Sequence, residues 1–216
     1  MRRAVQSGFT LIELLIVVGI IGLLSAVLVP QLLESKAVIL ARAEEGHLKK
    51  LGTFFTIYKA RNKESLPVEG GHKLLLALWT SKVMNHTEEN FAFFWTPESQ
   101  DPVFLEKRAM VSKEEDPWPT LAGTSSDDTH YAGRAKKELR GLSNTSEQQA
   151  VAATDNEGMN CLADGTVCVL YNDFLTTKLF FAEQLIQDHG AVDPRKEPVV
   201  MVGESALIPA CKKLEY

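Results

Sequence analysis

The feature that most constrains this chain is an apolar run from Phe9 to Val29 that contains a single acid, Glu13, near its start. The rest of the run carries no charge, and its length matches the roughly 20 residues that a helix needs to cross a bilayer. We therefore predict a membrane-spanning helix here. Arg2 and Arg3 precede the run, and because cations tend to stay on the cytoplasmic side, we expect a cytoplasmic N-terminus with the remainder of the chain across the membrane.

The acid at position 13 needs a partner, because a charged side chain in a membrane helix costs about 2.5–3.5 kcal/mol. A secretory signal would have a shorter apolar stretch, and the candidate cleavage site near Ser25 lies inside the longer run. A plain signal anchor leaves Glu13 unexplained. If the chain is cut between Gly8 and Phe9, however, a new α-amino group appears at i and i+4 from the carboxylate, which is neighbour spacing in a helix.

These residues carry a resemblance to a known family. A short basic leader ending at Gly8, then Phe9-Thr10-Leu11-Ile12-Glu13 and an apolar helix to Pro30, resembles the class III signal of type IV pilins and type II secretion pseudopilins. The resemblance implies that a prepilin peptidase cuts after Gly8 and methylates the amine of Phe9. It also implies that Glu13 neutralises the amine of an adjacent subunit during fibre assembly. The residues alone indicate only that Glu13 needs a cationic partner.

The helical period continues beyond Pro30 to about Arg61. In this second half the pattern is amphipathic, as expected for a helix that packs one face on a domain. Pro30 removes a backbone hydrogen bond and predicts a kink in this helix. We predict an α+β, pilin-like fold, in which the long N-terminal helix, membrane-spanning in its first half, packs on a small head with antiparallel strands. The expected organisation is a leader (1–8), a transmembrane or fibre-core helix (9–29), its amphipathic continuation (30–62) and an extracytoplasmic head (63–216).

Several shorter elements are predicted in the head. Residues 62–71 indicate a helix exit and loop, followed by a helix over 73–79, and this passage is similar to that of major, G-type pseudopilins. We expect strands at 91–97, 103–105 and 199–202, a long polar surface loop between 111 and 150, and a helix over 173–189 that Asp173 caps and Gly190 ends. Within that loop, His130 to Arg134 resembles a tyrosine-and-glycine turn of large pilin-like proteins.

The cysteines are compatible with an oxidising compartment, since all three follow the membrane segment. Asp164-Gly165 lies between two β-prone runs and predicts a two-residue hairpin turn, which would place Cys161 opposite Cys168. A cross-strand disulfide between them and two reduced, buried thiols are both compatible with this pattern. Cys211 could pair with either of the two.

The remaining residues offer little catalytic or binding chemistry. The net charge of −5 argues against nucleic acid as a partner, and we expect the local cations Arg134, Lys136, Lys137 and Arg140 to form a solvated face. The sequence has no metalloprotease, nucleophile-elbow or phosphate-loop motif, and we expect its scattered histidines to be surface or loop residues. No cofactor is predicted. A calcium ion is a weak alternative, with candidate oxygens on Asp155, Asn156, Glu157, Asp164 and Asp173.

These observations predict a non-enzymatic, single-pass subunit of the bacterial inner membrane with its head in the periplasm. The preferred hypothesis is a pseudopilin of a type II secretion-like system that polymerises through its N-terminal helix for protein export. The alternatives are a type IV pilus subunit for adhesion or DNA uptake and a membrane-anchored periplasmic enzyme. The resemblance implies three kinds of partner: the prepilin peptidase, other pilin or pseudopilin subunits, and an inner-membrane assembly platform.

Overall fold

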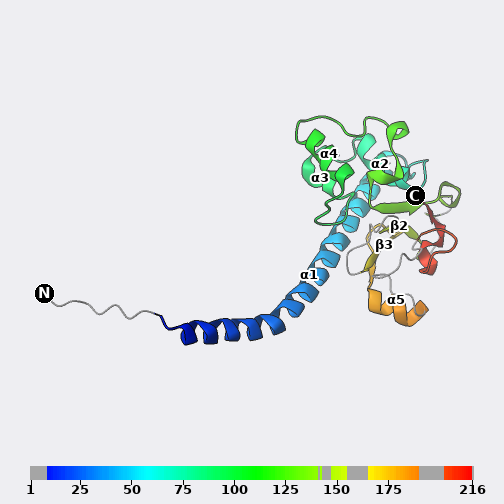
Figure 1. Ribbon diagram of the computed structural model, residues 1–216. Coiled ribbons are helices and arrows are strands. Elements are labelled where there is room, and N and C mark those ends of the chain that lie inside the picture. The colour runs from blue at the N-terminus through cyan, green and yellow to red at the C-terminus, as the bar shows by residue number, and fades with distance from the viewer. Residues whose placement is uncertain (1–8, 141, 143–146, 155–164, 190–201, 216) are drawn as a thin grey trace. The chain divides into compact units, whose positions relative to one another are not determined.

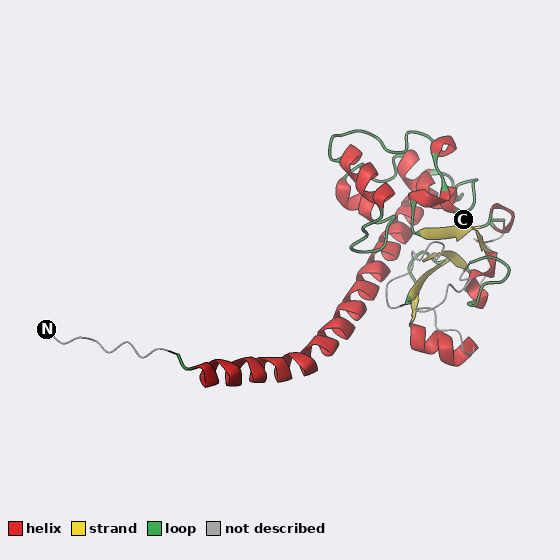
Figure 2. Cartoon of the chain, viewed as in Figure 1, coloured by secondary structure: helices red, strands yellow, loops and turns green. Residues whose placement is uncertain are grey.

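The computed structural model describes residues 9–140, 142, 147–154, 165–189 and 202–215 (Figure 1). The chain divides into two compact units, of which the first ends at Ile39 and the second begins at Leu40. We call them the stem and the head, and each is described by itself. The described part of the stem is almost entirely helical, whereas the head combines helices with one sheet (Figure 2).

Helix α1 (Leu11–Arg61) is 51 residues long and belongs to both units, which confirms the predicted long N-terminal helix. Pro30 lies inside it. In the head, α1 buries one face through residues that recur every three or four positions, as an amphipathic helix should. These residues are Ala41, Glu44, Leu48, Leu51 and Phe55.

One five-stranded antiparallel sheet forms the centre of the head. Its strands, in chain order, are β1 (Tyr131–Arg134), β2 (Ala150–Thr154), β3 (Val167–Tyr171), β4 (Thr177–Phe180) and β5 (Leu214–Glu215). In space they follow the order β4-β3-β2-β1-β5. The long helix with this sheet confirms the α+β class.

Both faces of the sheet are covered. Cys168 and Leu170 of β3 belong to the core that contains α1 and α2 (His72–Thr80), whereas Val167, Val169 and Tyr171 belong to a second core. That second core also receives Leu185 from helix α5 (Ala182–His189). Because alternate residues of a strand point to opposite faces, a strand buried on both sides has the continuous apolar sequence seen in β3.

Two predicted strands are wrong, because residues 91–97 and 103–105 lie in or next to helices. Helix α3 (Glu88–Ala92) starts at Thr87, whose hydroxyl accepts a hydrogen bond from the Asn90 amide. Helix α4 (Pro102–Val111) starts at Asp101, whose carboxylate accepts from the amide of Val103 at 2.7 Å. The aromatic side chains that suggested a strand instead pack around Trp79 and Trp118. Short 3-10 helices occupy Leu121–Gly123, Ser126–Asp128, Lys136–Glu138 and Pro209–Lys213.

The predicted surface loop over 111–150 is also wrong in part, because it contains the buried strand β1. Arg134 in that strand is buried and not part of a solvated basic face. Its guanidinium donates to the carbonyl of Ala150 at 2.9 Å and to the side-chain oxygen of Gln149. These acceptors replace the water that the guanidinium loses on burial.

The predicted helix over 173–189 begins only at Ala182. Asp173 does not cap it. Its carboxylate accepts from the amides of Leu175 and Thr176 instead, in a tight turn that leads into β4. Phe174 adopts a left-handed φ of 57° in this turn. Residues 199–201 of the predicted last strand, and the predicted helix end at Gly190, lie outside the described residues.

The pairing of Cys161 opposite Cys168 stays a prediction. Cys168 lies opposite Leu179 of β4, and on its other side its amide donates to the hydroxyl of Thr154 in β2 at 2.9 Å. Cys168 and Cys211 are buried free thiols. Cys161 lies outside the described residues.

The close approach between α1 and the turn before β4 gives a matched pair of substitutions. A Cβ added at Gly52 would lie 2.2 Å from the carbonyl oxygen of Phe174, whereas one at Gly46 meets nothing within 4 Å. We expect Gly52→Ala to destabilise the head by about 1–3 kcal/mol through this clash. Gly46→Ala should stabilise it by about 0.5–1 kcal/mol through helix propensity. Urea unfolding of the full chain in detergent measures both, and equal effects would contradict the described packing.

Candidate assembly site

The start of α1 holds the acid that the sequence singled out. The carboxylate of Glu13 accepts a hydrogen bond from the Thr10 amide at 2.8 Å and another from the Thr10 hydroxyl at 2.6 Å. The amide of Glu13 in turn donates to the Thr10 hydroxyl at 3.3 Å. This reciprocal arrangement is a capping box, which satisfies helix amides that would otherwise lack acceptors.

The capping box was missed at the sequence level, although its signal was present. A Thr followed three positions later by Glu, just before an apolar run, is the typical pattern of a helix start. The structure therefore gives the Glu13 carboxylate a partner in its own chain. The partner groups are the neutral amide and hydroxyl of Thr10, which are dipoles and carry no positive charge. A capping glutamine would serve the helix equally well, so the cap alone does not explain the choice of an acid.

The residues that follow provide the apolar surface of the stem. In the described part of the chain, α1 is the one helix long and apolar enough to cross a membrane, with a mean hydropathy of 2.8 over its best window. That window is wholly exposed, with side chains such as Leu14, Ile21 and Leu28 open to their surroundings. A face of this kind needs lipid or other helices to cover it.

The predicted cleavage point lies at the edge of the described residues. Phe9 is 79% exposed and precedes the helix, and Gly8 lies outside the described part. In sequence, the amide of Phe9 is one residue before the Thr10 group that binds Glu13. An amine created at Phe9 would therefore be close to the capping box in the chain.

A comparison with family models supports this assignment of the N-terminus. Residues 3–29 match the model of the prokaryotic N-terminal methylation motif. In this segment the chain is similar to proteins that carry this motif. The matched segment contains Gly8, Phe9 and Glu13, together with the apolar half of the stem.

A curated relative extends the likeness beyond the motif. The chain is 39% identical over 62 residues to the type II secretion system core protein G of Pseudomonas aeruginosa. The match covers 29% of this chain and 44% of the relative, so the chain spans less than half the length of the protein it resembles. No solved structure matches the chain.

The head contains a second acid of α1 in an unusual place. Glu44 is fully buried, and its carboxylate accepts a hydrogen bond from the hydroxyl of Thr154 in β2. The same hydroxyl accepts from the Cys168 amide of β3, so a relay of hydrogen bonds connects the helix to two strands. Burial raises the pKa of the nearby Tyr131 phenol well above its usual value, and the adjacent Glu44 raises it further.

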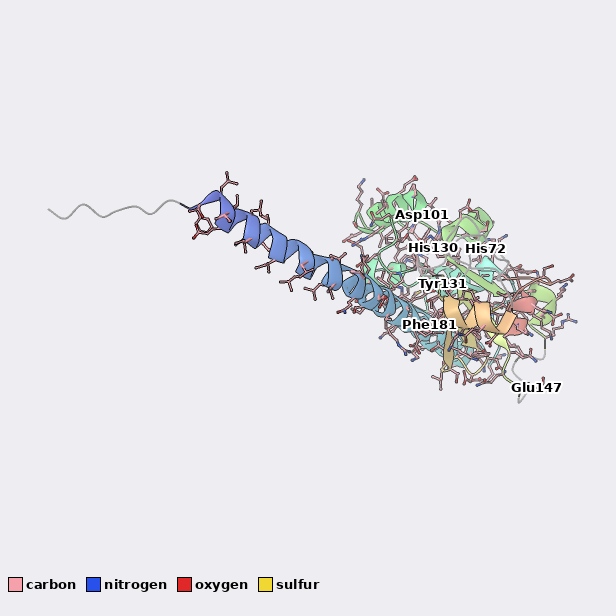
Figure 3. The ribbon with its side chains drawn as sticks, turned by 60° about the horizontal axis from the view of Figure 1, so that its bottom comes forward. His72, Asp101, His130, Tyr131, Glu147 and Phe181 are labelled. Carbon is pink, nitrogen blue, oxygen red and sulfur yellow. The ribbon has the colours of Figure 1, made fainter. Side chains whose placement is uncertain are left out.

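A hydroxyl, an imidazole and a carboxylate lie close together in the head, and two of the residues, His130 and Asp101, are labelled in Figure 3. The Thr96 hydroxyl lies 2.8 Å from Nδ1 of His130, and Nε2 of that ring lies 3.7 Å from the Asp101 carboxylate. His130 lies in the bend before β1 and is only 5% exposed, so it is a buried loop residue. The Thr96 amide also approaches Nδ1 at 3.4 Å, and the other Asp101 oxygen caps α4, so these contacts tie the segment before α4 to β1.

Metal binding has little support in the described residues, which contain no cluster of three or more potential ligands among His, Cys, Asp and Glu. Four of the five candidate calcium ligands, Asp155, Asn156, Glu157 and Asp164, lie outside the described part. The carboxylate of the fifth, Asp173, accepts hydrogen bonds from its own turn.

The burial of His130 predicts a pH-dependent stability. Desolvation lowers its pKa, against an opposing effect of Asp101. Because the folded pKa is below that of the unfolded chain, the stabilising contribution is complete above about pH 6.5 and is lost as the pH falls below it. The loss can reach about 1.4 kcal/mol per pH unit for one proton. Urea unfolding of the full chain measures this effect. Between pH 7 and pH 5, the free energy of unfolding should fall less for His130→Gln than for wild type, and an equal fall would contradict the effect.

Proposed function

We propose that this chain is a structural subunit of a pilin-like fibre, and specifically a pseudopilin of a type II secretion-like system. The single observation that carries the proposal is the methylation motif over residues 3–29, which coincides with the exposed apolar stem. The likeness to a type II secretion core protein favours secretion over adhesion or DNA uptake. No catalytic role is assigned to the head.

Maturation would remove the leader. In this proposal a prepilin peptidase cuts between Gly8 and Phe9, and the new amine of Phe9 is methylated. Arg2 and Arg3 hold the N-terminus in the cytoplasm, so that the head lies in the periplasm and the apolar half of the stem spans the inner membrane.

Assembly would then change the partner of Glu13. In a single chain its carboxylate is bound by the amide and hydroxyl of Thr10. In a polymer the Phe9 amine of a neighbouring copy adds the positive charge that a carboxylate in apolar surroundings requires. The capping box keeps the carboxylate oriented and partly compensated until that amine arrives.

The rest of the stem would provide the fibre core. Apolar side chains between Phe9 and Val29 pack against those of neighbours, and Pro30 gives α1 a kink at the end of this segment. From Leu40 on, the same helix is part of the head. Other pilin or pseudopilin subunits and an inner-membrane assembly platform are the partners that this arrangement requires.

The maturation step is tested by the mass of the mature N-terminus. We expect the chain purified from membranes to begin at methylated Phe9 when the host contains a prepilin peptidase, and to keep Met1 when the peptidase is absent. Mass spectrometry of the N-terminal peptide distinguishes the two. An assembled chain that still carries Met1 would overturn the proposal.

The role of the charge is tested by Glu13→Gln, which separates capping from ion pairing. Glutamine can still close the capping box, so helix content should be unchanged by circular dichroism. It cannot neutralise an amine, so incorporation into polymer should fall at least about tenfold, the size of effect expected for a lost charge pair away from water.

Glu34→Gln is the matched control, since Glu34 is also an exposed acid of the stem but lies outside the apolar run. It should assemble like the wild type. If Glu13→Gln also assembles normally, the carboxylate is needed only as a cap and the ion-pair role fails.

A further inference from the structure

A groove of about 930 Å³ opens on the head between the loop that follows α1 and the segment after β1. Cations and apolar side chains line it together. The cations are Lys136, Lys137 and Arg140, and the apolar lining includes Leu66, Pro67 and Leu139. This composition suits a ligand segment that is anionic and that also covers the apolar side chains of the groove.

The two acids of the groove are already engaged. Glu64 pairs with Lys59 at 3.5 Å, and the carboxylate of Glu215 accepts from the Lys136 amide at 3.0 Å. The ammonium of Lys136 is in turn held by Glu69 at 3.0 Å. Glu64 is therefore paired with a lysine outside the groove, and the three cations of the groove outnumber Glu215.

Two cations are left without a close counter-ion. Lys137 has only a 3.9 Å contact with Glu204, and both side chains are highly exposed, at 72% and 92%. Arg140 makes no ion pair with any residue that the structure describes. Such an excess of positive charge beside an apolar strip attracts a complementary acidic surface.

The chain itself presents a matching acidic segment at the end of α4. Glu114 and Glu115 are exposed, and neither forms an ion pair with another described residue. Their amides donate to the carbonyls of Val111 and Met110 at 3.0 Å, and Glu114 has a left-handed φ of 62°. Carboxylates at the C-terminal, negative end of a helix are unfavourably placed, and a cationic partner would relieve that repulsion.

We propose that the groove receives the Glu114–Glu115 turn of a second copy of this chain. The cations of the groove and the exposed carboxylates of the turn are complementary in charge. Figure 1 shows α4 and the C-terminal end, which carries β5, on different sides of the head. A contact between two different surfaces does not close into a symmetric dimer and can repeat from copy to copy, as a fibre requires. The inference rests on the proposed polymer and names the contact between its heads.

The test uses full-length chains with two different affinity tags, expressed together in membranes. One copy carries Lys137→Cys and the other Glu114→Cys, and the yield of the mixed disulfide reports the contact between heads. We expect this disulfide to form above the background of chains with one added cysteine. Adding Arg140→Glu to the first copy should lower the yield about 2- to 5-fold, the range for exposed ion pairs. Adding Glu115→Arg to the second copy should then restore it.

Matched controls are Lys212→Glu and Glu106→Lys, which reverse exposed charges outside the groove and the turn and should leave the yield unchanged. A disulfide yield at background level overturns the proposed contact. A fall in yield that Glu115→Arg does not restore also overturns it, and would indicate that the groove binds an acidic segment of another protein. Co-purification of the two tags in detergent reports polymerisation separately. Co-purification without the mixed disulfide rejects only this inference, and the absence of both also rejects the proposed function.

Discussion

The constraint on which this structure depends is the need to compensate a carboxylate at the start of an apolar helix. Glu13 has no ionic partner next to it in sequence, and leaving its charge in hydrocarbon would cost several kcal/mol. The Thr10 capping box supplies two hydrogen bonds to the carboxylate and at the same time starts α1. Because this compensation uses dipoles and no counter-charge, it leaves the acid able to bind a cation. One residue can therefore start the helix in the single chain and, in the proposed polymer, select a neighbour.

A second carboxylate of the same helix fixes α1 to the head. Glu44 is buried against the sheet, where the Thr154 hydroxyl donates to it, and the hydroxyl also holds the Cys168 amide. A buried polar group costs free energy unless its hydrogen bonds are made, so this relay disfavours other positions of the helix on the sheet. Gly52 adds a steric requirement about two turns further along the helix, where α1 approaches the backbone of Phe174. The two contacts fix the helix to the sheet at two separate points.

The elements that could be predicted from the sequence are those that depend on a local pattern of residues. The length of α1 and the position of α2 follow from apolar periodicity, and the strand β3 follows from its β-branched residues. Helices α3 and α4 were mistaken for strands because aromatic residues such as Phe91 and Trp95 favour strands, although Thr87 and Asp101-Pro102 mark helix starts. Strand β1 and the burial of Arg134 could not be predicted, since the groups that compensate this cation lie up to 16 residues away in β2. The contact of His130 with Thr96, 34 residues apart, has no local signal either.

The most direct test of the central claim is to ask which amine the Glu13 carboxylate meets in the assembled state. Two isotopically distinct populations of the full chain would be assembled together and treated with a carbodiimide, which joins a carboxylate to an amine in contact with it. Mass spectrometry of the products should then find peptides in which Glu13 of one isotope is linked to the N-terminal amine of Phe9 of the other. Assembled material in which this linkage occurs only within one copy, or does not occur, would contradict the account.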